Sequence, residues 1–116
     1  MELVFIGFGE AAFHMAKGLK GEGAISLGAF DAFKDDAKAG PLIVQRAQQA
    51  QVTLFDTIEE ACREARFVVC LTSASSALAL AERILPLLKD GQHYIDMNSA
   101  APTVKQAIER LPRAAG

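Results

Sequence analysis

The 116-residue sequence contains no tryptophan, one tyrosine, two histidines and two cysteines. Two cysteines cannot form the dense disulfide network of a small secreted domain, so we expect Cys62 and Cys70 to be reduced packing residues of a cytoplasmic protein. No apolar run reaches the roughly 18 residues of a membrane span, and no leader precedes the first apolar run, so no membrane partner is expected. The net charge is −2 without a basic block, which argues against nucleic acid as a partner.

The sequence does contain enough apolar residues for one core, at 51% of the chain, and we expect a single domain over residues 1–116. Apolar runs that read as strands alternate with helical patterns along the whole chain. The expected strands are 3–6, 25–30, 51–55, 66–71 and 93–97. The expected helices are 10–20, 41–49, one capped by Asp56 or Thr57, one from Ser75 or Ser76, and one led by Pro102. This alternation predicts a doubly wound parallel α/β sheet, a Rossmann fold, of strand order 3-2-1-4-5.

The first 31 residues carry the clearest functional pattern, a strand, a glycine turn, a helix, a second strand and a terminal acid. Gly7 permits a tight turn, and Gly9 lets the backbone approach a pyrophosphate closely. Ala12 takes the third motif position and is small enough for close packing of helix on strand. Asp31 falls where an acid accepts hydrogen bonds from a ribose. The free N–H groups of the helix start favour phosphate, so the pattern predicts dinucleotide binding.

The choice between the two nicotinamide dinucleotides depends on the charges that follow the second strand. Asp31 repels a 2′-phosphate and favours NAD, although Lys34 nearby could accommodate NADP. Asp35 and Asp36, which follow Lys34, make the local charge negative again and so favour NAD. Ala32 and Phe33 are candidates to flank the adenine, with core packing an equal alternative for Phe33.

Other residue types that often carry chemistry have structural explanations here. We expect Glu10, at the helix start, to point its carboxylate to solvent. His14 falls on the second turn of the first helix and His93 at the start of the fifth strand, so both are expected to be structural or exposed. No Ser-His-Asp order, CxxC pair or metal-ligand spacing is present.

Two segments resemble the β-hydroxyacid dehydrogenases, which include the 3-hydroxyisobutyrate and 6-phosphogluconate enzymes. The first is the glycine turn with Met15-Ala16-Lys17-Gly18-Leu19, similar to the family pattern GxGxMGxxMAxxL, except that Ala11-Ala12 replaces Met-Gly. The second is Asp96-Met97-Asn98-Ser99-Ala100-Ala101-Pro102, which is similar to the family's D-x-S-T-x-S-P segment. Asn98 stands where the family commonly has Ser, which is closer to the phosphogluconate type.

The resemblance implies further site residues. Thr72 and Ser73 would lie beside the nicotinamide-side ribose, with capping of the following helix as the alternative. Asn98 and Ser99 would form the polar floor under nicotinamide and substrate, with a cap for the helix led by Pro102 as the alternative. The expected cofactor-binding set is Gly7, Phe8, Gly9, Glu10, Ala11, Asp31, Ala32, Phe33, Leu71, Thr72, Ser73 and Asn98, and the substrate-binding set is Asn98 and Ser99.

The resemblance also implies an NAD(P)-dependent oxidoreductase of a β-hydroxy acid, such as one like 6-phosphogluconate, with or without decarboxylation. The family's sixth strand, catalytic Lys and helical C-terminal domain would follow Gly116, so we expect a fragment of a longer, homo-oligomeric enzyme that is inactive alone and has no catalytic residue in this chain. The alternatives are an imine or ketone reductase with the same N-terminal domain and a stand-alone nucleotide-binding regulatory module.

Overall fold

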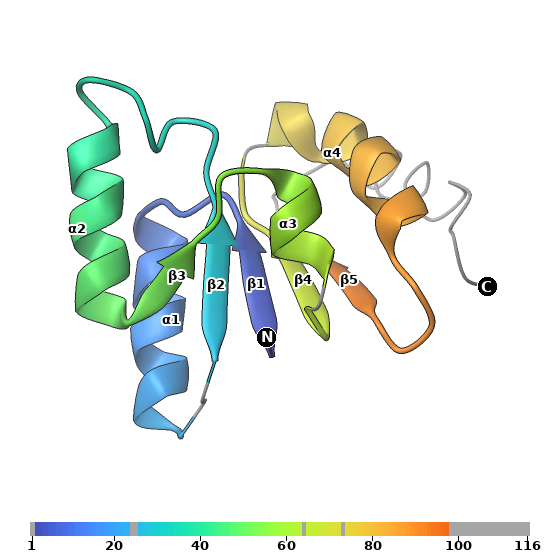
Figure 1. Cartoon of the computed structure of the whole chain (residues 1–116), viewed down its shortest axis with the longest axis horizontal. Coiled ribbons are helices and arrows are strands. Elements are labelled where there is room, and N and C mark those ends of the chain that lie inside the picture. Colours follow the sequence, from blue (N-terminus) through green and yellow to red (C-terminus); the bar gives the residue numbers. More distant parts are fainter. Residues whose placement is uncertain (1, 24–25, 64, 73, 98–116) are drawn as a thin grey trace.

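Five parallel strands form one sheet of order β3-β2-β1-β4-β5 (Figure 1). The computed structural model describes residues 2–23, 26–63, 65–72 and 74–97. The strands are β1 (Leu3–Ile6), β2 (Leu27–Phe30), β3 (Val52–Leu54), β4 (Phe67–Cys70) and β5 (His93–Asp96). The predicted fold class and strand order are therefore confirmed. Strands β2 and β3 follow on one side of β1, and β4 and β5 follow on its other side, so the strand order switches between β1 and β4. Ligands bind at such switch points in open α/β sheets.

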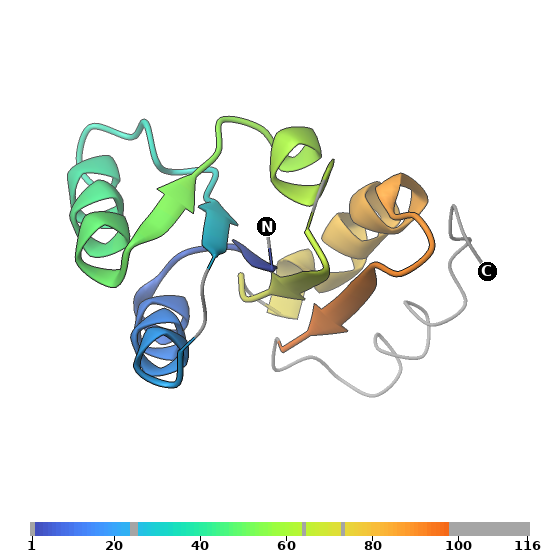
Figure 2. The ribbon, with the colours of Figure 1, turned by 60° about the horizontal axis from the view of Figure 1, so that its bottom comes forward.

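Helices cover both faces of the sheet. They are α1 (Glu10–Gly21), α2 (Gly40–Ala50), α3 (Ile58–Arg63) and α4 (Ala77–Ile84), with 3₁₀ turns η1 (Ala74–Ser76) and η2 (Leu85–Leu87) on either side of α4. Helices α1 and α2 pack on one face and α3 and α4 on the other (Figure 2). Such two-sided cover explains why the central strands are apolar at consecutive positions instead of alternating.

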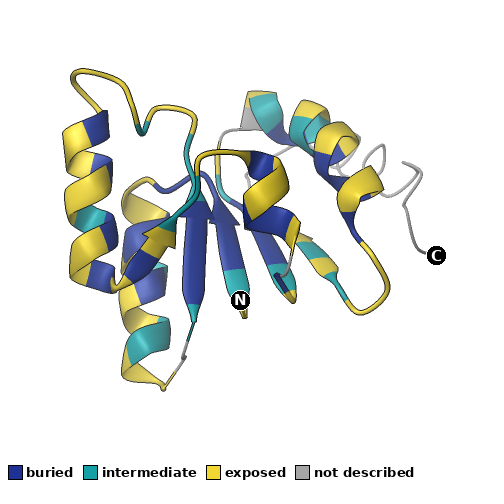
Figure 3. Cartoon of the chain, in the orientation of Figure 1, coloured by how far each residue is buried: buried dark blue, intermediate teal, exposed yellow. Residues whose placement is uncertain are grey.

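Strand β1 shows this two-sided burial most clearly. Val4 and Ile6 pack with α3 and α4, whereas Phe5, between them, packs with α1 and α2. All three are at most 1% exposed. Figure 3 shows the central strands as the most continuous buried part of the molecule. The carboxyl end of β1, from which the glycine turn leaves, is consequently anchored from both sides.

Local capping sets the ends of the helices on both sides of β3. Pro41 lies in the first turn of α2, where its missing N–H costs nothing. Gln51 ends α2 in the left-handed conformation, at a φ of 58°. Thr57 begins α3, because its Oγ1 accepts a hydrogen bond from the N–H of Glu60 at 3.1 Å. Of the two caps predicted, Asp56 and Thr57, Thr57 is the one that forms this bond.

A few details differ from the sequence predictions. The segment expected to begin a helix at Ser75 or Ser76 first forms the 3₁₀ turn η1, and α4 begins at Ala77. The helix predicted from Pro102 lies outside the described residues. Cys62 and Cys70 are both buried and not joined in a disulfide, as predicted. Burial raises the pKa of the Cys62 thiol to about 12, so this side chain stays protonated and apolar in character. Within the described residues, no helix is long and apolar enough to cross a membrane.

Candidate functional site

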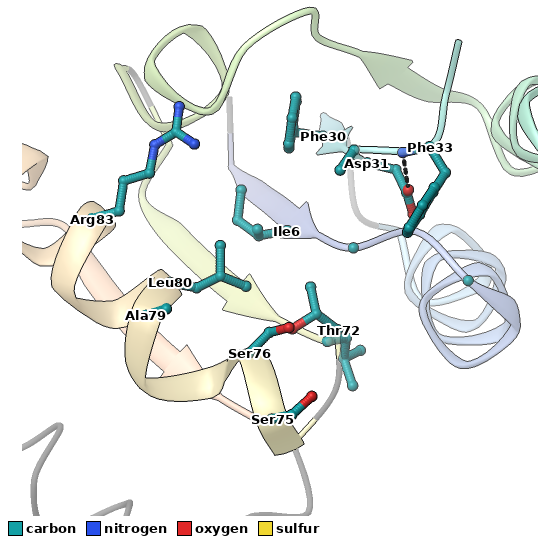
Figure 4. Close-up of a pocket in the computed structure, with 14 residues that line it drawn as sticks. Ile6, Phe30, Asp31, Phe33, Thr72, Ser75, Ser76, Ala79, Leu80 and Arg83 are labelled. Atoms are coloured by element: carbon teal, nitrogen blue, oxygen red, sulfur yellow. Dashed lines mark hydrogen bonds between the residues drawn. The ribbon is translucent and has the colours of Figure 1, made fainter. Parts of the chain in front are cut away.

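A cavity of about 710 Å³ opens at the carboxyl ends of β1, β2 and β4 and continues along α4 (Figure 4). It lies at the switch point of the sheet and includes the glycine turn, for which the sequence predicted dinucleotide binding. Its lining combines the glycine turn, the loop after β2 and one side of α4. The lining residues are Ile6, Gly7, Gly9, Phe30, Asp31, Ala32, Phe33, Leu71, Thr72, Ser75, Ser76, Ala79, Leu80 and Arg83.

The two glycines of the turn have different roles. Gly7 has a φ of +92°, and a Cβ there would collide with the carbonyl oxygen of Leu71 and the methyl group of Thr72. Only glycine fits, because both the dihedral angle and the backbone just after β4 exclude a side chain. Gly9 has an ordinary φ of −87°, and a Cβ there would meet nothing within 4 Å. The space over Gly9 opens into the cavity, so this glycine leaves room for a ligand.

Helix α1 begins directly beside this open space. Gly9 caps the helix without a side chain, so the N–H groups of the first turn have no side-chain acceptor at the cap. These amides and the helix dipole favour an anion. Glu10 is placed as predicted, because its carboxylate is 75% exposed and lies 3.7 Å from His14 on the outer side of the helix. Ala12 is 1% exposed in the core, which allows α1 to approach the sheet.

Asp31 lies beside the glycine turn at the carboxyl end of β2. Its Oδ2 accepts a hydrogen bond from the N–H of Phe8 at 2.8 Å, and its Oδ1 accepts one from the N–H of Phe33 at 2.9 Å. A carboxylate offers about four lone-pair directions, so two remain for hydroxyl donors in the cavity. The same carboxylate therefore fixes the turn and can accept further hydrogen bonds.

The remaining predicted residues of the first two loops divide into three groups. Phe33 and Ala32 line the cavity, and Phe33 is 62% exposed, so core packing, the alternative for Phe33, is wrong. Phe8 contributes only its backbone, because its ring is fully buried with its centroid 6.0 Å from that of Phe5. Ala11 is exposed on α1 and, like Glu10, is not among the residues that line the cavity.

Lys34 is not among the residues that line the cavity either, although it follows Phe33 directly. Its Nζ lies 2.7 Å from Oδ1 of Asp56 and 3.1 Å from Oδ1 of Asp35. Hydrogen bonds to Asp56 and then Asp35 raise the pKa of the Lys34 ammonium above its ordinary value. The cation that could favour NADP is thus held by two carboxylates.

The α4 side of the cavity includes residues that sequence reasoning missed. Leu80 and Ala79 form an apolar wall facing Ile6, and Arg83 lies at the end of the cavity away from Ser75 (Figure 4). An Arg83 Nη atom lies 3.0 Å from Oε1 of Glu59 on α3. No motif marks these positions, because they depend on how α4 packs on the sheet. The apolar spacing of α4 identifies its core side but not which residues border a ligand.

Several predicted site residues fall outside the cavity or outside the described part of the chain. Thr72 and Leu71 line the cavity, as expected, whereas Ser73, Asn98 and Ser99 lie outside the described residues. His93 lies at the start of β5, stacked on Phe67 at a centroid distance of 5.4 Å, away from the carboxyl ends of the strands. Among the described residues, no group of His, Cys, Asp or Glu is arranged to hold a metal ion.

The geometry fits an elongated ligand with an anionic centre and a hydroxylated group at one side. The open space over Gly9 and the first-turn amides suit a pyrophosphate, Asp31 suits a ribose, and the cavity walls beyond are largely apolar. Asp31 is the one carboxylate among the described lining residues, and each of its oxygens accepts a backbone hydrogen bond. The described site can therefore bind and orient a ligand, but it lacks a side chain placed for general acid–base work.

Comparison with known proteins agrees with this description. A family model described as the NAD-binding domain of 6-phosphogluconate dehydrogenase matches residues 2–116. No curated protein matches the sequence. Among solved structures, a conserved hypothetical protein from Sinorhizobium meliloti 1021 is 33% identical with a TM-score of 0.84, and the match covers 93% of this chain and 36% of that one.

Two more distant structures share the fold. A 3-hydroxyisobutyrate dehydrogenase from Mycobacterium tuberculosis, solved with L-serine, is 21% identical with a TM-score of 0.76, over 94% of this chain and 36% of that one. A pyrroline carboxylate reductase from Plasmodium falciparum, with NADP bound, is 16% identical with a TM-score of 0.66, over 93% of this chain and 38% of that one. The present chain spans little more than a third of the length of these structures.

Proposed function

The chain belongs to the family of the NAD-binding domain of 6-phosphogluconate dehydrogenase, and on that premise we propose that it holds NAD for an oxidoreductase of β-hydroxy acids. Bound NAD supplies the hydride acceptor for oxidation of the substrate alcohol. The residues of this chain bind and orient that group. The substrate class, including one like 6-phosphogluconate with decarboxylation, is supported by the family match and by the fold shared with 3-hydroxyisobutyrate dehydrogenase.

The binding part of the proposal assigns each described loop a task. The amides at the start of α1 hold the pyrophosphate over Gly9, where the structure leaves room for it. Asp31 accepts hydrogen bonds from the adenosine ribose, and Ala32 and Phe33 flank the adenine. We assign Thr72, which follows β4, to the nicotinamide side, and with it Ser73 and Asn98, which lie outside the described residues. Asn98 and Ser99 contact the substrate.

A second domain completes the proposed enzyme. The matched structures are about three times as long as this chain, and a substrate site needs a proton-exchanging group that the described cavity lacks. We assign that group to a helical domain that packs beside β5. The cofactor domain alone then binds NAD without turnover.

The observation that carries the proposal is the position of Asp31. Its carboxylate is fixed to the glycine turn by the Phe8 amide, and it faces the cavity where a ribose bearing a 2′-phosphate would be repelled. We expect NAD to bind more tightly than NADP. Calorimetric titration of the purified protein with each dinucleotide at one ionic strength tests this. Equal or tighter binding of NADP would overturn the assigned preference, and binding of neither would overturn the proposed function.

A further inference from the structure

The loop between β2 and α2 places one lysine next to the proposed ribose site. The N–H of Lys34 donates a hydrogen bond to the carbonyl oxygen of Asp31 at 3.1 Å, so the two residues belong to one tight turn. From this position, a lysine side chain is long enough to reach a group bound at the Asp31 carboxylate. A cation there would offset the repulsion between Asp31 and a 2′-phosphate.

The Lys34 side chain nevertheless points elsewhere. Its Nζ contacts Asp56 at 2.7 Å, and Asp56 belongs to a different loop, between β3 and α3. Asp35 is a second partner at 3.1 Å, but its side chain is 89% exposed. The Lys34 side chain is only 16% exposed, which is low for a lysine in a surface loop. The short contact to Asp56 therefore determines the direction in which this cation lies.

The backbone around Lys34 is fixed independently of that ion pair. Gly40 packs so closely against the Lys34 carbonyl that a Cβ at Gly40 would collide with it. Asp36 accepts hydrogen bonds from the N–H groups of Lys38 and Ala39 at 2.9 and 2.8 Å. Removal of the Asp56 carboxylate should consequently leave Lys34 with only the contact to the exposed, adjacent Asp35, while the loop stays in place.

We propose that Asp56 is a cofactor-selectivity residue, which holds the Lys34 ammonium away from the ribose site and so denies NADP a compensating cation. The inference rests on the proposed binding of the adenosine ribose at Asp31. Asp56 acts through Lys34, and neither residue is among those that line the cavity. The selectivity for NAD then has two sources, the repulsion exerted by Asp31 and the sequestration of Lys34.

The test compares the ratio of the NADP and NAD dissociation constants between variants, measured by calorimetry at one ionic strength. In Asp56→Asn, the ratio should fall about two- to fivefold, the range expected for one exposed ion pair. In the double variant Asp56→Asn, Lys34→Met, it should return to the wild-type value. Asp90→Asn is the matched control, because it makes the same charge change at an exposed position outside the cavity. A purely structural effect on the loop would weaken both cofactors and leave the ratio unchanged.

The outcomes separate this inference from the proposed function. If the wild-type protein binds NAD but Asp56→Asn leaves the ratio unchanged, the role of Asp56 is wrong and the proposed function stands. If the shift persists in the double variant, or appears equally in Asp90→Asn, it does not act through Lys34 and the inference is also wrong. If the wild-type protein binds neither dinucleotide, both the inference and the proposed function are overturned.

Discussion

The Oδ2 atom of Asp31 lies 2.8 Å from the backbone nitrogen of Phe8 and accepts its hydrogen bond, which ties the end of β2 to the glycine turn after β1. The two groups are 23 residues apart in sequence. Through this bond, the carboxylate proposed to bind ribose also positions the backbone proposed to bind pyrophosphate. The parts of the site that hold the two halves of an adenosine diphosphate group are therefore mechanically linked.

We predict that Asp31→Asn weakens NAD binding about 10- to 150-fold, the loss expected when charge-assisted hydrogen bonds become neutral or unpaired. The amide NH₂ group would face the N–H of either Phe8 or Phe33, so one contact that fixes the turn would be lost as well. Calorimetry and a thermal melt of the same sample measure the two effects. Unchanged affinity for NAD would contradict the role of Asp31 in binding.

A second prediction concerns the glycine turn. Gly9→Val should abolish NAD binding with little loss of stability, because the Cβ at Gly9 has open space and an ordinary φ. The added side chain would fill the volume assigned to the pyrophosphate. Calorimetry measures binding, and circular dichroism confirms the fold. Undiminished affinity in Gly9→Val would remove the phosphate-binding argument.

Gly7→Ala is the matched comparison for Gly9→Val. At Gly7, the positive φ and the collision with the Leu71 carbonyl should destabilise the protein by at least about 1–3 kcal/mol. A lower melting temperature in Gly7→Ala and an unchanged one in Gly9→Val would separate the structural glycine from the binding glycine. The sequence assigned these two roles, and the structure supplies the dihedral angles and contacts that distinguish them.

The sequence could predict much of the architecture, because the fold is encoded by local patterns of fixed period. The continuous apolar runs 3–6 and 66–71 indicated buried strands, and glycine and acid positions placed the first βαβ unit. Such signals need only neighbouring residues. The strand order then followed from the handedness of the connections.

The details of the site depended on contacts that sequence spacing does not contain. Lys34 was a candidate to bind a 2′-phosphate until its contact with Asp56 showed which way it points. Arg83 borders the cavity only because α4 packs on the same face of the sheet as Ile6, and the exposure of Phe33 depends on the path of the loop. These features arise when elements distant in sequence meet, so no local pattern indicates them.

The loop before α2 should make stability sensitive to acid. Hydrogen bonds from the N–H groups of Ala39 and Lys38 lower the pKa of Asp36 below its ordinary value of 3.8. A carboxyl whose pKa is lower in the folded state stabilises the protein above its unfolded pKa, and this contribution is lost as the pH falls through the folded pKa. We expect Asp36→Asn to lower the melting temperature at pH 6, and to lower it less at a pH below 3.8, where the contribution is being lost. If the melting temperatures of the wild type and Asp36→Asn differ by the same amount at both pH values, this prediction is wrong.

Strand β5 should promote self-association of the chain. Ile95 and Met97 are 40% and 46% exposed, and β5 is an edge strand of the described sheet. Exposed apolar side chains beside an open strand edge favour association between copies. We expect light scattering to detect dimers or larger species, and Ile95→Lys to shift the population towards monomer. A wild-type protein that is monomeric at high concentration would refute the expectation.

The last prediction concerns turnover. Hydride transfer from a β-hydroxy acid needs a group that accepts the hydroxyl proton, and such help accelerates reactions about 10²–10⁴-fold. Among the described lining residues, Thr72, Ser75 and Ser76 do not exchange protons near neutral pH, and Asp31 is held at the glycine turn. We therefore expect the 116-residue chain to bind NAD without reducing it in the presence of any β-hydroxy acid.

Absorbance at 340 nm, read against a control without protein, measures this turnover. Coexpression with any coding sequence that follows residue 116 should produce activity if a second domain supplies the missing group. Formation of reduced cofactor by the 116-residue chain, lost in Asn98→Ala or Ser99→Ala, would show instead that this chain carries its own catalytic residues. Activity that survives both substitutions would place the proton acceptor elsewhere in the chain, and would equally contradict the division of labour between two domains.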